Sequence, residues 1–383
     1  MNLAPRNWLV FVLTFGICGC DVDNHDAGAQ VPAAELGPGE HQWRISSLEA
    51  EGIDREPFEA MVNLIEDESD IGIDGVVIVY KGALVFEDYF GKWDRKDIHS
   101  TRSAAKAITS ALVGVAIDQG FLESVDQTVL PFFPEYEGTI ENWDERKNDI
   151  TIGHVLSMTS GVRNNEDNMY PTEDWIKFYW DQPLAADPGE KFSYATSGIV
   201  TIGNVVTRAS KLRIPAFADK YLFEPMGIKK YRWPITNSRG NQGLAMTGGG
   251  LHLTPRDMAK FGLLYLNKGR WNGQRLLSEE WVAESTRKHA TSDLYGEDFG
   301  YLWRMIDREI DGKPLRSFEA WGNGGQFIMV WPELELVVAW TGENYGKFPE
   351  MERPFQLTEQ YILPAITKAS MSGSSASAAT AVP

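Results

Sequence analysis

The sequence predicts a mixed α/β (α+β) fold, in which one antiparallel sheet is flanked by helices and interrupted by an all-helical insertion. Paired β-rich runs lie near both ends of the folded body, and helical patterns fill the chain between them. No repeat with a period of about 20 to 50 residues is visible, so a solenoid or propeller is not expected. The 383 residues suffice for one large domain with an insertion.

The first predicted strand pair covers residues 75–80 and 83–90, which are rich in β-branched and aromatic side chains. Lys81 and Gly82 separate the two runs, and a two-residue connection of this kind is typical of a hairpin. A second pair, residues 326–331 and 334–341, is separated by a proline and a glutamate. We therefore expect strands from both ends of the body to close one sheet.

The chain between these strands shows helical patterns. Residues 104–118 are almost wholly apolar, which is typical of a helix buried on all sides. Residues 152–158 predict a short helix that ends before Ser160 and Gly161. Thr254 followed by a proline predicts an N-cap and first turn, and the helix it opens is expected to reach Asn267.

The two ends of the chain are not expected to belong to the fold. Residues 8–17 form an apolar run of ten residues after Arg6, too short to cross a hydrocarbon layer of about 30 Å. We interpret residues 1–19 as a signal peptide. The sequence that ends at Cys20 resembles a bacterial lipobox, which implies lipid modification of Cys20, with ordinary signal-peptidase cleavage as the alternative.

The rest of the chain divides into a tether at residues 20–42, a folded body at residues 43–368 and a Ser- and Ala-rich tail at residues 369–383, predicted to be disordered. A lipid on Cys20 would hold the body at the membrane, on the periplasmic side of a bacterial cell envelope. Without that lipid, the protein is expected to be secreted to the periplasm.

Composition excludes several functions. Lys and Arg number 36 against 54 Asp and Glu, and the net charge of −18 makes nucleic acid an unsuitable partner. The only cysteines are Cys18 and Cys20, so no disulfide is expected in the body. The six histidines never occur at metal-ligand spacing, and no nucleotide-binding or zinc-protease motif is present, so neither a metal nor a cofactor is expected.

Ser103 and Lys106 form a Ser-x-x-Lys pattern at the start of the apolar helix. This spacing puts both side chains on one face of a helix, where the lysine can accept the proton of the serine if its surroundings disfavour the charged form. The alternative is a hydroxyl near a helix start, with the lysine extended to solvent. The same spacing at Ser285 and Lys288, in a polar stretch, is interpreted as chance.

Further segments decide between these interpretations. Their order along residues 75–341 resembles the order of motifs in the serine hydrolases related to penicillin-binding proteins and class C β-lactamases. Five segments carry the resemblance: residues 99–106 (HSTRSAAK), 150–161 (ITIGHVLSMTSG), 188–194 (PGEKFSY), 248–257 (GGGLHLTPRD) and 321–326 (WGNGGQ). Residues 270–273 (RWNG) and the final Gly-Gly-Gln are more similar to esterases and 6-aminohexanoate-dimer hydrolases of this group. The resemblance implies a β-lactamase/transpeptidase-like fold.

The resemblance also implies roles for two further motifs. Tyr194 matches the tyrosine of the family's Tyr-x-Asn motif, although Thr196 replaces the asparagine, and its hydroxyl would relay a proton together with Lys106. A buried tyrosine bonded to backbone is the alternative. The family's Lys-Thr-Gly motif falls on Asn323-Gly324-Gly325, where the backbone N–H of Gln326, together with that of Ser103, would form the oxyanion hole.

Substrate contacts are expected from Asn323, Gly324 and Gly325. These residues and Thr196 offer no charge for an anion, so a neutral or cationic ester or amide is expected and penicillin hydrolysis is disfavoured.

Residues 164–182, which include Tyr170 and Trp175, are either a lid that holds an acyl chain or a surface loop and helix that bury their aromatic side chains. Trp321 is likewise either a pocket wall or a core residue.

The sequence thus predicts a serine hydrolase that cleaves a small ester or amide through a covalent acyl-enzyme on Ser103. Two alternatives stay open at this point. One is a penicillin-interactive DD-peptidase or weak β-lactamase, and the other is a non-catalytic binding or sensor lipoprotein of the same fold.

Overall fold

A nine-stranded sheet forms the centre of the protein. The computed structural model describes residues 44–68, 71–163, 165–236, 243–310 and 312–379. The strands lie in the order β1-β3-β2-β13-β12-β11-β10-β9-β8. Their bounds are β1 Arg44–Ile45, β2 Ile73–Tyr80, β3 Ala83–Tyr89, β8 Ala290–Thr291, β9 Asp298–Phe299, β10 Arg304–Ile310, β11 Lys313–Gly322, β12 Gln326–Trp331 and β13 Leu336–Gly342.

Both predicted hairpins are present, as β2–β3 and β12–β13, and β2 pairs with β13 so that the two ends of the body meet in mid-sheet. Every pairing in this sheet is antiparallel except that of β1, which runs parallel to β3. The predicted antiparallel sheet is therefore confirmed except at this edge, where a two-residue strand joins the sheet from a separate part of the chain.

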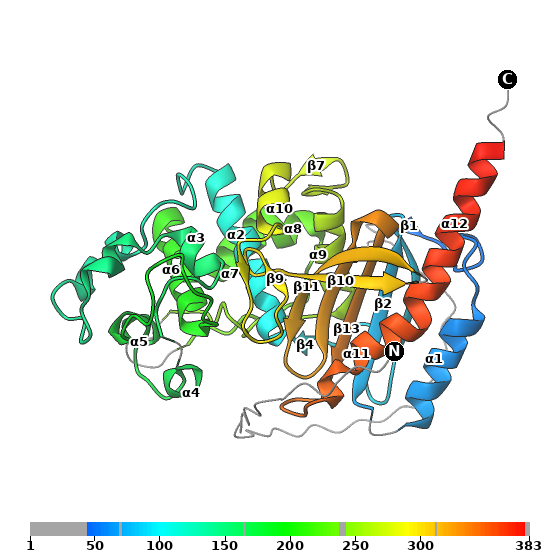
Figure 1. The fold of residues 1–383 in the computed structure, drawn as a ribbon, viewed down its shortest axis with the longest axis horizontal. Coiled ribbons are helices and arrows are strands. Elements are labelled where there is room, and N and C mark those ends of the chain that lie inside the picture. Colours follow the sequence, from blue (N-terminus) through cyan, green and yellow to red (C-terminus); the bar gives the residue numbers. More distant parts are fainter. Residues whose placement is uncertain (1–43, 69–70, 164, 237–242, 311, 380–383) are drawn as a thin grey trace.

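The sheet is covered on both faces, and each face has its own apolar core. Successive strand residues point to opposite faces, so Val77 and Val79 of β2 belong to the first core and Val76 and Ile78 to the second. Helices α1 (Glu56–Asp67), α11 (Arg353–Leu357) and α12 (Leu363–Ala379) cover the second core. In Figure 1 they lie on one side of the sheet and the remaining helices on the other.

The helical part lies between β3 and β10 in the sequence. Its helices are α2 Ala105–Asp118, α3 Ile152–Leu156, α4 Glu166–Met169, α5 Trp175–Asp181, α6 Thr196–Ser210, α7 Ile214–Ala218, α8 Glu224–Met226, α9 Pro255–Leu266 and α10 Glu279–Ser285. The predicted helices at residues 104–118, 152–158 and 254–267 correspond to α2, α3 and α9. Thr254 caps α9 as expected, because its hydroxyl accepts from the backbone N–H of Asp257.

Two predictions about this architecture need correction. The insertion is largely rather than wholly helical, because it also contains the two-residue strands β4 His99–Ser100, β5 His252–Leu253, β6 Arg270–Trp271 and β7 Gln274–Arg275, besides β8 and β9. In addition, α12 continues to Ala379, so residues 369–379 are helical where their composition predicted a disordered tail. The helix propensity of alanine, the highest of all residues, is a reason for this continuation.

The predicted signal peptide, the lipidation site Cys20 and the tether lie outside the described residues. Among the helices that the structure does describe, none combines the length and the apolar composition needed to cross a membrane.

Candidate active site

Ser103 and Lys106 lie next to each other where α2 begins. Ser103 belongs to a 3₁₀ turn, Arg102–Ala104, and Lys106 to the first turn of α2. The Lys106 Nζ lies 3.1 Å from the Ser103 Oγ and donates to the Gly248 carbonyl oxygen at 2.6 Å. Lys106 is only 3% exposed. The lysine therefore does not extend to solvent, as the alternative interpretation required, and its amine is within proton-transfer distance of the serine hydroxyl.

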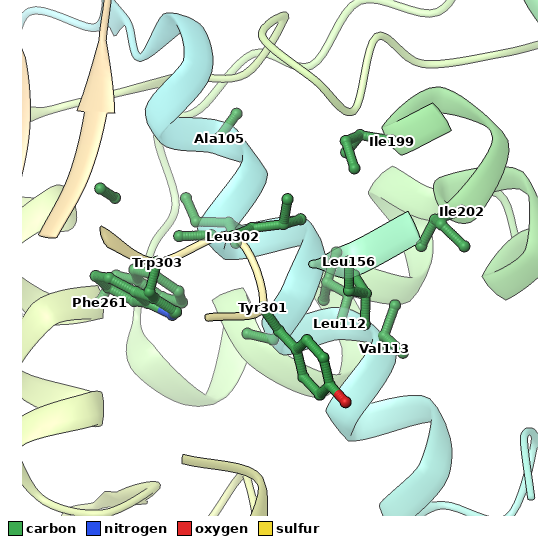
Figure 2. Close-up of a cluster of buried hydrophobic side chains, with 14 of the residues drawn as sticks. Ala105, Leu112, Val113, Leu156, Ile199, Ile202, Phe261, Tyr301, Leu302 and Trp303 are labelled. Atoms are coloured by element: carbon green, nitrogen blue, oxygen red, sulfur yellow. The ribbon is translucent and has the colours of Figure 1, made fainter. Parts of the chain in front are cut away.

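Helix α2 is a rigid support for this pair because apolar side chains surround it. Figure 2 shows Ala105, Leu112 and Val113 of α2 among side chains from several other elements. The labelled neighbours are Leu156, Ile199, Ile202, Phe261, Tyr301, Leu302 and Trp303. Nearly all of α2 is buried, as its composition predicted. Close packing of this kind restricts the positions of the residues at its N-terminus.

The residue before Gly248, Thr247, is hydrogen-bonded to both α2 and α6, which restricts the Gly248 carbonyl group that binds Lys106. Thr109 of α2 donates to the Thr247 carbonyl oxygen at 2.8 Å, and Thr247 donates to the Ile199 carbonyl oxygen at 2.7 Å. A β-carbon on Gly248 would lie 2.5 Å from the Thr196 Cγ2, so only glycine fits there. The glycine segment is thus clamped between α2 and α6.

Tyr194 lies beside Lys106, with 4.9 Å between the Lys106 Nζ and the centre of the phenol ring. The loop that carries it is tied to Met158, whose carbonyl oxygen accepts from the Ser193 N–H at 2.7 Å. Three of the predicted catalytic side chains, those of Ser103, Lys106 and Tyr194, therefore come together in one place.

A carboxylate that could not be singled out from the sequence lies at the N-terminus of α6, the end that follows Tyr194. Glu166 accepts a hydrogen bond from the backbone N–H of Thr196, the first residue of α6. A negative side chain at a helix N-terminus is stabilised by the unpaired N–H groups and by the helix dipole. Glu166 was missed because nothing distinguishes it from the other 53 acidic residues of this chain, which has 54 in all.

The aromatic segment before Tyr194 is partly buried. Tyr179 and Trp180 on α5 are fully buried in the first core, as the surface-loop alternative expects. Tyr170 follows α4 and is 42% exposed, and Trp175 is the first residue of α5 and is half-buried. The exposed part of the segment is therefore its beginning, around Tyr170.

The third motif follows the end of β11, against the turn that carries Ser103. A β-carbon on Gly322 would lie 2.3 Å from the Thr101 carbonyl oxygen, so this glycine permits the close approach. Gly324 and Gly325 both have φ of +94°, a conformation that side chains disfavour. Gln326 begins β12 opposite Gly322, and its side chain donates to the Gly342 carbonyl oxygen at 2.5 Å.

Trp321 points to the other face of the sheet. Because neighbouring strand residues alternate in direction, Trp321 faces away from Thr101 when Gly322 faces it. Its indole N–H donates to Glu319 at 2.8 Å, and its ring centre lies 4.6 Å from that of Phe355. Trp321 thus packs against the second core, which favours the core alternative over the pocket wall.

A positive charge lies beside the third motif, although Asn323 replaces the family's cation. The guanidinium carbon of Arg102 is 4.6 Å from the ring centre of Tyr345. That ring covers Gly324, since a β-carbon there would lie 2.5 Å from it. Burial raises the pKa of Tyr345, and the Arg102 charge opposes the rise. Thr196, Asn323 and Gly324 themselves carry no charge, as stated from the sequence, and Arg102 was not singled out there.

A buried hydrogen-bonded pair of side chains fixes the strand that precedes Ser103. The Asp74 carboxylate on β2 lies 3.0 Å from the His99 Nδ1 on β4, and both side chains are almost completely buried. Burial raises the pKa of Asp74, and the hydrogen bond with His99 opposes the rise. The pair connects the chain just before the Ser103 turn to the central sheet.

Comparison with known proteins agrees with this geometry. The family model described as Beta-lactamase matches residues 61–355. The chain belongs to the β-lactamase family. It is thus a β-lactamase-related serine hydrolase, and it has the β-lactamase/transpeptidase-like fold that the motifs implied.

Individual relatives of the β-lactamase family are distant. A 6-aminohexanoate-dimer hydrolase from Paenarthrobacter ureafaciens is 23% identical over 68% of this chain and 70% of its own length. A Beta-lactamase from Escherichia coli K12 is 25% identical over 77% of this chain and 90% of its own length. The structure of a putative 6-aminohexanoate-dimer hydrolase from Bacillus anthracis has a TM-score of 0.67 at 19% identity and covers 80% of this chain and 82% of its own.

Within the described part of the chain, no group of three or more His, Cys, Asp or Glu side chains is arranged to hold a metal ion.

Proposed function

We propose that the protein hydrolyses a small ester or amide through an acyl-enzyme formed on Ser103. The observation that carries this proposal is the distance of 3.1 Å between the Lys106 Nζ and the Ser103 Oγ, with the lysine buried and held by Gly248. A neutral amine that donates to the Gly248 carbonyl oxygen can direct its lone pair to the serine hydroxyl. The name of the Paenarthrobacter relative, a hydrolase of an amino-acid dimer, supports an amide as readily as an ester.

Acylation begins when the Ser103 Oγ attacks the substrate carbonyl carbon and Lys106 takes the hydroxyl proton. The carbonyl oxygen becomes an oxyanion, for which the backbone N–H groups of Ser103 and Gln326 are the proposed donors. The intermediate collapses when the carbon–heteroatom bond breaks, and the proton passes from Lys106 to the leaving group, with the Tyr194 hydroxyl as relay. Water then attacks the ester on Ser103 by the same steps in reverse.

A fluorophosphonate probe tests the nucleophile. We expect one adduct per chain, located on Ser103 by mass spectrometry of peptides. The variants Ser103→Ala and Lys106→Ala should lose labelling and p-nitrophenyl ester turnover by about 10³-fold or more, since each removes one member of a cooperating pair.

The chain contains a matched control in its second Ser-x-x-Lys pattern. Ser285 donates to the Val282 carbonyl oxygen on α10, and Lys288 pairs with Asp298. The variant Ser285→Ala should label at the wild-type rate. A folded wild-type protein without an adduct on Ser103, and without turnover of any ester in a panel, would instead indicate the non-catalytic binding protein.

A β-lactam-directed activity is the second candidate, and two observations favour it. The Escherichia coli relative is named a Beta-lactamase, and Arg102 supplies a cation near the third motif. Labelling of Ser103 by a fluorescent penicillin separates the candidates, because an enzyme restricted to linear esters and amides would not retain that label.

A further inference from the structure

We infer that Glu352 binds a positively charged group of the substrate, an ammonium in the simplest case, in a subsite walled by the rings of Tyr295 and Trp321. This inference rests on the proposed function and specifies its substrate class. Glu352 ends the 3₁₀ turn Glu350–Glu352 and directly precedes α11, yet its side chain does not cap that helix.

The carboxylate of Glu352 is half-buried and has no partner for its charge among the residues that the structure describes. Burial alone raises its pKa, and no charged group in the described part of the chain opposes the rise. Charges that are taken out of water are normally paired in folded proteins. A ligand cation would therefore supply the interaction that the chain itself does not provide.

The turn that carries Glu352 lies against the third motif. A β-carbon on Gly325 would lie 3.8 Å from the Met351 carbonyl oxygen and 3.5 Å from the Pro354 Cγ. The end of β11, just before this motif, is in close contact with the chain that leads into the Ser103 turn. Glu352 thus belongs to the segment that flanks the strand end behind the nucleophile.

Aromatic rings lie beside this turn. The ring centre of Tyr295 is 5.6 Å from that of Trp321, which in turn is 4.6 Å from that of Phe355, three residues after Glu352. Tyr295 is 37% exposed, and Trp321 is half-buried although its other side packs against the second core. The faces of such rings attract cations, so they suit an ammonium group.

One cation of the chain already lies on these rings, and its charge is compensated. The guanidinium carbon of Arg304 is 4.4 Å from the ring centre of Trp321 and 5.3 Å from that of Tyr295. Glu297 forms an ion pair with Arg304, and both side chains are almost completely buried. This pair shows that the rings accept a cation, and it leaves the charge of Glu352 uncompensated.

Tyr295 connects the subsite to the catalytic residues. Burial raises the pKa of Tyr295, and the Arg304 charge opposes the rise. Glu352 and Tyr194 both add to it. Since charges act over about 10 Å at an ionic strength of about 0.1 M, Tyr295 lies within that reach of both groups. Glu352 is thus placed to hold one end of a molecule whose ester or amide bond lies at Ser103.

Two isosteric substrate pairs test the inference. The first compares p-nitrophenyl 4-(trimethylammonio)butanoate with p-nitrophenyl 5,5-dimethylhexanoate, which places the charge on the acyl side. The second compares butyrylcholine with 3,3-dimethylbutyl butyrate, which places it on the leaving group. Each pair exchanges one quaternary nitrogen for carbon, so only the charge differs. We expect Glu352→Gln to lower the ratio of kcat/KM for the cationic and the neutral member by about 10-fold in one pair.

Controls separate charge recognition from general damage. Glu352→Asp keeps the charge and should retain a ratio above that of Glu352→Gln. Glu350→Gln removes an equal charge from an exposed position of the same turn and should leave the ratio unchanged. A purely structural Glu352 would change both members of each pair equally. Unchanged ratios in both pairs would overturn the inference while leaving the proposed function intact.

A binding measurement needs neither turnover nor a variant of Glu352. Calorimetry of Ser103→Ala with butyrylcholine and its neutral isostere, and with the methyl esters of the two acyl groups, compares affinities within each pair. A salt concentration of about 0.5 M screens the long-range attraction by the net charge of −18. The cationic member of one pair should bind about 5-fold more tightly, as for a short-range ion pair that salt screens only in part. Equal affinities in both pairs would overturn the inference, whereas selective binding without turnover by the wild type would contradict the proposed function alone.

Discussion

At the scale of single residues, Lys106 and Tyr194 make different contacts in the proposed site. Lys106 contacts both the Ser103 hydroxyl and the Gly248 carbonyl oxygen, and in the proposed mechanism it takes the first proton. Tyr194 presents its ring to the lysine, and the centre of that ring is 4.9 Å from the Nζ. The phenol ring therefore contributes to the packing of the site, whereas its hydroxyl is the group proposed to relay the proton.

The variant Tyr194→Phe separates these contributions, because it keeps the ring and removes only the hydroxyl. We expect kcat for an ester to fall by about 10²- to 10⁴-fold, the usual contribution of a general acid–base group, while KM changes little. The melting temperature should stay close to that of the wild type. Steady-state kinetics and thermal unfolding of the same preparation measure both effects, and an unchanged kcat would remove Tyr194 from the proton relay.

The sequence sufficed for the residues whose spacing is local. Ser103 and Lys106 are three positions apart, so helix geometry alone predicts their contact. The position of Arg102 beside Gly324 could not be predicted, because it depends on how β11 ends against the nucleophile turn and on Tyr345 after β13. Trp321 shows the same limit, since the face to which it points follows from the strand register rather than from its neighbours in the sequence.

At the scale of elements, α9 shows how closely the helical part approaches the sheet. Gly262 lies in the middle of this helix, and a β-carbon there would lie 2.5 Å from the Val337 Cγ1 and 3.0 Å from the Ile328 Cγ2. Glycine in a helix interior costs about 1 kcal/mol relative to alanine. The sequence tolerates this cost because the sheet occupies the space that a side chain would need.

We therefore expect Gly262→Ala to destabilise the protein by about 1 to 3 kcal/mol, since overpacking exceeds the gain in helix propensity. Urea unfolding measures the free-energy change. Gly153→Ala in α3 is the comparison, because its nearest neighbour, the Tyr301 hydroxyl, would be 3.3 Å away. Its loss of stability should be smaller, and a stabilising Gly262→Ala would show that α9 can move away from the sheet.

Helices and hairpins were the predictable elements, because apolar periodicity, turn residues and caps can be recognised within a short stretch of sequence. The two-residue strands were not, since a strand such as β4 exists only through its partner β5 far along the chain. The same holds for β1, because its parallel pairing with β3 cannot be recognised from its own two-residue sequence.

At the scale of the whole molecule, three histidines link stability to pH. Burial lowers the pKa of His154, His252 and His289, and in each case it is the largest cause. The folded protein therefore binds these protons less tightly than the unfolded chain, whose histidines titrate near pH 6.5. Their contribution to stability is fully present above about pH 6.5 and is lost as the pH falls through the lowered pKa values.

We expect the melting temperature to decline as the pH is lowered from 7.5 to 5.5. His154 is the histidine to replace, because its Nδ1 accepts from the Thr151 N–H at 3.3 Å in a capping box, which protonation would abolish. The variant His154→Gln should show a shallower decline than the wild type. Burial raises the pKa of Asp74, so this residue has the opposite effect on the pH dependence of stability. Its contribution is the same in the wild type and in His154→Gln. Parallel curves for the two proteins would contradict this assignment.

The pairing of β2 with β13 also determines when the protein can become active during its synthesis. Ser103 is synthesised before the helical part, whereas the strand end that backs its turn and the hairpin beside it are synthesised after that part. Contacts between such distant parts of a chain form slowly. A nascent chain therefore cannot complete the proposed site until translation has passed Gly342.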